Sequence, residues 1–153
     1  MWERVLVAGY TAAPNGLRRR VLRLTTPGYR VGVLGVLRRP DGRVLLVDQP
    51  YTTGWSLPGG DIKRGETVRD ALARELREEL GVRLDVPTPR LAAQRPQDRW
   101  VTFVAELDVD DRIADAARPQ SAELRRVEWF PPDSLPQVHG DVVGPLRMLG
   151  FAV

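Results

Sequence analysis

The chain has 153 residues, of which 42% are hydrophobic and 28% charged, and this composition fits one globular domain that buries a core of its own. It contains no cysteine, which excludes disulfides, thiolate metal sites and a cysteine nucleophile. The net charge of +3 comes with 22 arginines against the single Lys63, a bias typical of GC-rich coding, and no segment approaches the roughly 20 apolar residues of a membrane span. We therefore expect one cytoplasmic domain over residues 1–153, with no membrane association.

The predicted elements begin with a short helix at Pro14–Leu24, inside an N-terminal extension, residues 1–28, that we expect to pack on the domain. The cluster Arg18–Arg23 within it invites a polyanion site, but we favour a solvated helix face or a dimer contact. A nucleic-acid partner is therefore not expected. A homodimer through this segment or the sheet is compatible with the sequence, although no specific feature supports it.

The next elements form a mixed sheet with helices on its faces. A strand at Tyr29–Arg39, a turn at Pro40–Gly42 and a second strand at Arg43–Gln49 predict a hairpin. A helix at Thr67–Leu80 follows, closed by Gly81. The remaining predictions are strands at Val82–Val86, Arg90–Gln94, Arg99–Leu107 and Leu124–Phe130, a surface loop at Asp108–Gln120, and a last helix at Asp141–Leu149.

The helix at Thr67–Leu80 gathers three glutamates. At 100° per residue its apolar residues form one stripe, with Glu75 and Glu79 beside that stripe and Glu78 further round. Like charges at this spacing cost a helix about 0.2 to 0.5 kcal/mol per pair. Arginines four residues away from acidic ones would explain the charges as a salt-bridged solvated helix.

The spacing of the glycines, glutamates and arginines from Gly60 onward favours a different interpretation. Glu66 follows Gly60 after five residues, and Arg74 follows Glu66 after seven. The run then continues as Glu75, Leu76, Arg77, Glu78, Glu79, Leu80, Gly81 and Val82. Chance would produce this set about once in 10⁹ starting positions. Residues Gly60–Val82 resemble a complete Nudix box, and the preceding GWSLPG resembles the usual entry into it.

This resemblance implies an α/β fold, the Nudix α/β/α sandwich around a mixed β-sheet. It also implies a pyrophosphohydrolase that cleaves a diphosphate linkage attached to a nucleoside, with Mg²⁺ or Mn²⁺ as cofactor. Mg²⁺ takes oxygen ligands such as a partly buried cluster of carboxylates, and its binding would relieve their repulsion. The ion would neutralise phosphate charge and acidify a bound water.

Roles follow for the residues of the box. Glu78 and Glu79 are predicted metal ligands, and Glu75 is a third ligand or the general base. Arg74 is predicted to orient Glu75 or Glu66 through a charge-assisted contact, with Glu66 as structural support. The glycines at 59 and 60 permit a tight turn, in which we expect Gly59 to offer its backbone carbonyl to the metal and Gly60 to support the turn.

Residues outside the box complete the candidate site. Glu123 is the first candidate for a catalytic base there, ahead of Asp98 and Glu106. His139, the only histidine, is expected to be a surface or structural residue. The aromatic residues that could stack on a base are Tyr51, Trp55, Trp100, Phe103 and Trp129, of which Tyr51, Trp55 and Trp100 are our candidates for substrate binding.

The sequence leaves the substrate open. We expect a nucleoside triphosphate, an oxidised one included, that yields a nucleoside monophosphate and pyrophosphate. ADP-ribose or a nucleotide sugar is the alternative substrate class. A nucleotide-sensing module without catalysis and an RNA 5′-end pyrophosphohydrolase are the alternative functions.

Overall fold

The structure is a computed structural model that describes residues 14, 16, 17, 28–95 and 97–153. The helix predicted at Pro14–Leu24 and the Arg18–Arg23 cluster therefore lie largely outside the described residues. No helix in the described part of the chain is long and apolar enough to cross a membrane.

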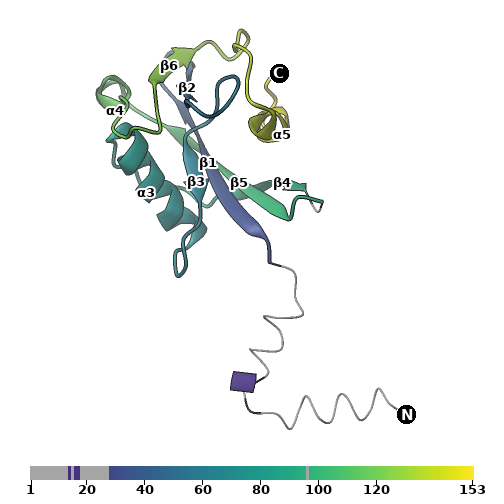
Figure 1. Cartoon of the computed structure of the whole chain (residues 1–153). Helices are drawn as coiled ribbons and strands as arrows, with labels where there is room; N and C mark the ends of the chain where they lie inside the picture. Colours follow the sequence, from purple (N-terminus) through teal and green to yellow (C-terminus); the bar gives the residue numbers. More distant parts are fainter. Residues whose placement is uncertain (1–13, 15, 18–27, 96) are drawn as a thin grey trace.

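A six-stranded mixed sheet forms the centre of the molecule (Figure 1). Its main path runs β4-β5-β1-β2-β6, and β3 pairs with β1 off this path. β1 and β5 are parallel, whereas the other pairs are antiparallel. The strands are β1 (Arg30–Arg38), β2 (Val44–Asp48), β3 (Gly59–Asp61), β4 (Arg90–Arg95), β5 (Trp100–Asp108) and β6 (Arg126–Phe130).

Two helices cover opposite faces of this sheet (Figure 1). Helix α3 (Val68–Leu80) packs on the side chains of Val33 and Leu37, whereas α5 (Gly140–Met148) packs on Val36. Successive side chains of a strand point to opposite faces, so β1 contributes to both core clusters. The α/β/α sandwich with a mixed sheet is thereby confirmed.

Most predicted elements are present with bounds shifted by one or two residues, but two predictions were wrong. Val82–Val86 forms no strand; Val82 and Val86 are buried against the core without a ladder partner. The segment Asp108–Gln120 is not all loop, because it contains α4 (Asp111–Ala116), whose first turn is capped by the Asp110 carboxylate. The three-residue β3 was not predicted.

Helix α3 begins and ends where its sequence predicts. The Thr67 hydroxyl accepts a hydrogen bond from the Asp70 N–H, and Gly81 closes the helix in the left-handed conformation with φ 73°. Leu72, Leu76 and Leu80 are completely buried. The buried stripe fixes the rotation of the helix and therefore the direction in which its glutamates point.

Candidate active site

A cavity of about 500 Å³ gathers residues from three strands, two helices and the loops between elements. It lies between β1, β3, the start of β5, helix α3, the loops after β2 and before β6, and the start of α5. The predicted site residues that line it are Tyr51, Gly59, Gly60, Glu75, Glu79, Trp100 and Glu123. The fold thus brings together lining residues up to 112 positions apart in the chain, from Arg30 to Val142.

Helix α3 places its glutamates at three depths. Glu79 is only 3% exposed, the Glu75 side chain is 14% exposed and the Glu78 side chain 45%. This gradient follows the angular positions beside the buried stripe, as predicted. Glu78 does not line the cavity; it lies on the outer side of the helix, where Arg74 and Lys63 contact it.

The two glycines of β3 allow the sheet to approach these glutamates. A Cβ at Gly59, where φ is 140°, would collide with the carbonyl oxygen of Val33, and a Cβ at Gly60 would lie 2.6 Å from Oε1 of Glu75. The Gly59 N–H donates to Oε2 of Glu79 at 2.9 Å. The metal contact predicted for the Gly59 carbonyl stays a prediction.

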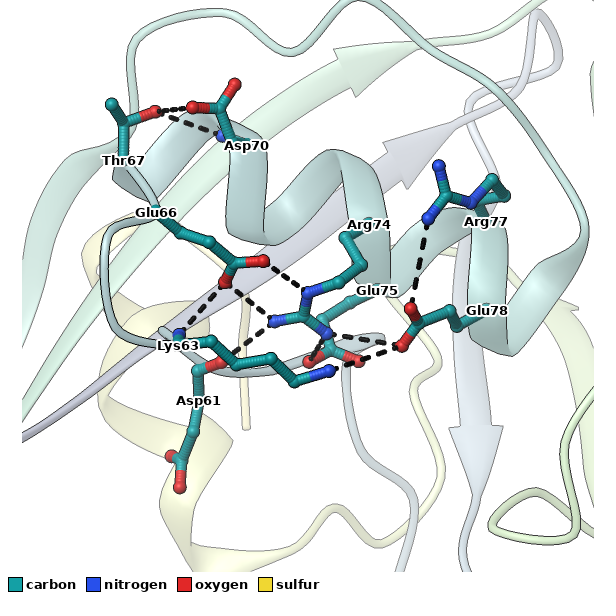
Figure 2. A network of polar contacts seen from close by, with 9 residues as sticks. All are labelled: Asp61, Lys63, Glu66, Thr67, Asp70, Arg74, Glu75, Arg77 and Glu78. Atoms are coloured by element: carbon teal, nitrogen blue, oxygen red, sulfur yellow. Dashed lines mark hydrogen bonds and ion pairs between the residues drawn. The ribbon is translucent and has the colours of Figure 1, made fainter.

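Arg74 joins the acidic residues into one network (Figure 2). Its Nε and one terminal nitrogen donate to the two carboxylate oxygens of Glu66 at 2.6 and 3.0 Å. The other terminal nitrogen donates to Glu75 at 2.6 Å and to Glu78 at 3.2 Å. Both contacts that we expected of Arg74, to Glu75 and to Glu66, are therefore present, and its role as an orienting residue stays a prediction.

This network shifts the pKa values of its members. The hydrogen bond from Arg74, followed by the Lys63 N–H, lowers the pKa of Glu66 to about 2. The bond to Glu66 likewise contributes most to raising the pKa of Arg74. Glu66 and Arg74 are consequently both charged at neutral pH. They form an ion pair next to Glu75.

Glu79 has the opposite shift. Burial raises its pKa to about 8, and the charges of Glu75, Glu123 and Glu78 add to this effect against the opposing Gly59 N–H. The pKa of Tyr51 is also raised, by desolvation first and then by the charge of Glu123. Acids from α3 and from the loop before β6 therefore act on the same buried carboxylate.

The other acids and the histidine occupy different places. Asp98 and Glu106 do not line the cavity; Asp98 lies 3.7 Å from Arg95, and Glu106 pairs with arginines of β1 and β4. His139 caps α5, because its Nδ1 accepts the Asp141 N–H at 3.4 Å, and it also lines the cavity. The structural reading of His139 is thus confirmed, with a position at the site that its sequence context did not indicate.

The aromatic candidates also differ in whether they line the cavity. Tyr51 and Trp100 line the cavity, whereas Trp55 lines a neighbouring hollow of about 410 Å³. The Trp55 ring packs edge-on against Phe130, with 4.9 Å between the ring centroids. Tyr51 and Trp100 therefore face the main cavity and Trp55 does not line it, and the substrate contacts predicted for all three stay predictions.

Three charged lining residues had no place among the predicted site residues. They are Arg30 at the start of β1, Asp61 at the end of β3 and Asp141 in α5. No local motif marks them, because their approach to the glutamates depends on strand register. The alternation that puts Arg30 on the same side of β1 as Leu34 is the only signal that could have indicated one of them.

A divalent cation fits the chemistry of these donors. In the described part of the chain, no three His, Asp or Glu side chains already converge as a metal-ligand cluster. However, Glu75 and Glu79 line one cavity, and their mutual repulsion is among the causes of the raised pKa of Glu79. Carboxylate oxygens gathered in one cavity suit Mg²⁺ or Mn²⁺, whose charge would favour the ionised form of Glu79. Glu78 would have to turn away from Arg74 to join them.

Comparisons with known proteins agree with this geometry. Residues 28–148 match the family model described as NUDIX domain. The chain is similar to the human 8-oxo-dGDP phosphatase NUDT18, with 31% identity over 132 residues that cover 84% of this chain and 38% of that protein. It is also similar to a MutT-like protein of Streptomyces ambofaciens, with 29% identity over 123 residues, 80% of this chain and 77% of that protein.

A solved structure extends the comparison to three dimensions. The crystal structure of a MutT Nudix hydrolase from Burkholderia pseudomallei aligns with a TM-score of 0.65 and 26% identity, over 79% of this chain and 98% of that chain. The present chain spans less than half the length of the human relative.

Proposed function

This chain belongs to the Nudix hydrolase family, and from that premise we propose that it hydrolyses a phosphoanhydride bond of a nucleoside di- or triphosphate and releases the nucleoside monophosphate. Oxidised purine nucleotides are the substrates we favour within this class. The human relative, named an 8-oxo-dGDP phosphatase, supports that preference. In the reaction an oxygen of water bonds to phosphorus, the bridging P–O bond breaks, and phosphate or pyrophosphate leaves.

The observation that supports this function best is the buried carboxylate of Glu79, surrounded by Glu75, Glu78 and Glu123. Desolvated like charges destabilise a protein unless they have a partner. A divalent cation would be that partner, and when bound it neutralises phosphate charge and acidifies a water molecule. We propose Glu75, Glu78 and Glu79 as its ligands.

The remaining residues position these ligands. Arg74 holds Glu75 in place and is itself held by both oxygens of Glu66, so the Glu75 carboxylate keeps one orientation. Gly59 fixes Glu79 through its N–H. Glu123 faces the same carboxylate from outside α3, so we propose it as the general base that accepts a proton from the attacking water.

A product assay tests this function. Purified protein with Mg²⁺ or Mn²⁺ is given nucleoside di- and triphosphates, 8-oxoguanine nucleotides, nucleotide sugars and ADP-ribose, and the products are separated by chromatography. We expect a nucleoside monophosphate from the di- and triphosphates. Glu79→Gln should lower kcat/KM by more than about a hundredfold, because it removes a proposed ligand without changing the side-chain volume.

Glu128→Gln is the matched control, since Glu128 lies on β6 with a half-exposed side chain paired with Arg126 and does not line the cavity. Full activity of Glu79→Gln would contradict the metal assignment. Turnover of ADP-ribose or nucleotide sugars alone would replace the proposed substrate class. No turnover of any compound, together with nucleotide binding, would favour a sensing module.

A further inference from the structure

The cavity has an unusual balance of charge. Its carboxylate residues are Asp61, Glu75, Glu79, Glu123 and Asp141. Among the described residues that line it, Arg30 is the only arginine or lysine. A nucleotide adds further negative charge, so Arg30 is the guanidinium or ammonium group that a bound substrate would meet along these walls.

Arg30 lies away from the glutamates along the sheet. Gly59, whose N–H binds Glu79, pairs with Leu34 of β1. A strand rises about 3.3 Å per residue, so Arg30 lies about 13 Å further along β1. In a nucleotide the ribose separates the phosphates from the base. A nucleotide with its phosphates at the glutamates, extended along β1 within this cavity, would place its base near Arg30.

The guanidinium of Arg30 has a fixed position, but only part of its hydrogen-bonding capacity is used by the described residues. One terminal nitrogen donates to Asp61 at 2.6 Å, and the central carbon lies 4.5 Å from the ring centroid of Trp100. In the part of the chain that the structure describes, this is the only hydrogen bond of the Arg30 side chain, which is 64% exposed. Its other donors are available to a ligand.

The backbone beneath Trp100 supports a functional role for this contact. Arg99 has φ 52°, the only positive φ among the described non-glycine residues, and its carbonyl accepts the Arg30 N–H at 2.8 Å. Such sparsely populated conformations cluster at functional sites. The guanidinium of Arg95 also lies 5.3 Å from the Trp100 ring centroid. The Trp100 ring thus contacts the guanidinium groups of both Arg30 and Arg95. These contacts favour a role in positioning Arg30 over the base stacking that the sequence suggested.

We propose that Arg30 determines base specificity by donating hydrogen bonds to a carbonyl oxygen of the nucleobase, with Trp100 and Asp61 as positioning residues. Guanine and 8-oxoguanine present the O6 acceptor, whereas adenine presents an amino donor at that place. Donors that face donors are left unpaired, so the enzyme selects oxopurines over adenine. This inference rests on the proposed function, because it uses the location of the phosphates.

The test compares kcat/KM for dGTP, 8-oxo-dGTP and dATP in the wild-type protein and in Arg30→Gln. We expect the variant to lose about tenfold or more on both guanine nucleotides and to keep its rate on dATP. Arg38→Gln is the matched control. Arg38 lies on the same strand, pairs with Glu106 at 3.2 Å and contacts the Phe151 ring at 4.8 Å, but it lies outside the cavity.

Two outcomes would overturn the proposal. An equal loss of kcat/KM on all three nucleotides would mean that Arg30 acts on the shared phosphates. Unchanged kcat/KM values for all three would mean that Arg30 does not contact the substrate. For Trp100, the positioning role predicts that Trp100→Phe keeps most of the preference for guanine nucleotides over dATP and that Trp100→Leu loses it.

A binding measurement separates this inference from the proposed function. Calorimetry with dGMP and dAMP, without metal, compares two ligands with the same sugar and phosphate, so a difference in affinity reports contact with the base. Wild-type protein should bind dGMP more tightly, and Arg30→Gln should lose that difference. If the protein hydrolyses none of the nucleotides but shows this preference, the proposed function fails and the assignment of Arg30 stands; equal binding of dGMP and dAMP by the wild-type protein overturns the assignment.

Discussion

Arg74 uses all three guanidinium nitrogens within one network, and this is the arrangement that a lysine cannot reproduce. Its bonds reach Glu66, Glu75, Glu78 and the carbonyl oxygen of Asp61. A lysine carries the same charge on a single nitrogen without the planar fork. The orientation of Glu75 therefore depends on the geometry of Arg74 and not only on its charge.

We predict that Arg74→Lys lowers kcat/KM by about 10- to 100-fold, the range typical for residues that orient metal ligands. Arg69→Lys is the control, because Arg69 lies on the same helix and pairs with Asp85 on the surface. Steady-state kinetics with circular dichroism measures both effects. A variant at position 74 with normal activity and normal helix content would contradict the orienting role.

At the scale of single elements, β3 shows how a short strand sets the geometry of the site. It has three residues, pairs with β1 and brings Gly60 against the carboxylate of Glu75. A methyl group at this place has no room unless Glu75 moves. The close approach of sheet and helix is thus encoded by a missing side chain.

We predict that Gly60→Ala lowers kcat/KM by about 10- to 100-fold, because it displaces Glu75 from its place beside Arg74. Gly28→Ala serves as control, since a Cβ at Gly28 has no neighbour within 4 Å among the residues that the structure describes. Activity and thermal unfolding should be compared for both variants. If Gly60→Ala is as active as Gly28→Ala, the position of Glu75 does not limit the reaction.

The elements differ in how well the sequence predicts them, for physical reasons. Helix α3 combines a cap, a periodic apolar stripe and a terminal glycine, so local signals suffice. Strand β3 contains two glycines and exists because β1 offers it a partner. The segment Val82–Val86 shows the converse, since its apolar residues are buried without a neighbouring strand. Pairing is a tertiary event that local patterns do not record.

The same distinction applies to the site. The glutamates of α3 belong to a motif whose spacing is local, and they were predicted. Arg30 and Asp141 reach the cavity from β1 and α5, and their positions depend on how distant strands and helices pack. Trp55 precedes the box in sequence, but its ring packs against Phe130 and lines a separate hollow, an arrangement that its local sequence does not indicate.

For the whole molecule, Glu79 couples stability to pH, and the proposed metal site would couple it to the ion as well. Its folded pKa is about 8 against an ordinary value of 4.5, so between these values the folded protein holds a proton that the unfolded chain has lost. Stability falls with pH wherever the folded state binds more protons. The free energy of unfolding of the metal-free protein should therefore fall as pH rises from 4.5 to about 8 and become level above it.

Chemical denaturation at several pH values, with a chelator present, measures this profile. Glu79→Gln cannot titrate and should give a flatter curve over the same window, whereas Glu128→Gln should keep the wild-type slope. Mg²⁺ binds the ionised carboxylates of the folded state, so it should raise the stability of the wild-type protein more at pH 8 than at pH 6. A ligand that loses its proton on binding makes the affinity for Mg²⁺ rise with pH. If Mg²⁺ stabilised the wild-type protein equally at pH 6 and pH 8, or stabilised Glu79→Gln as much as the wild-type protein, the ion would bind elsewhere.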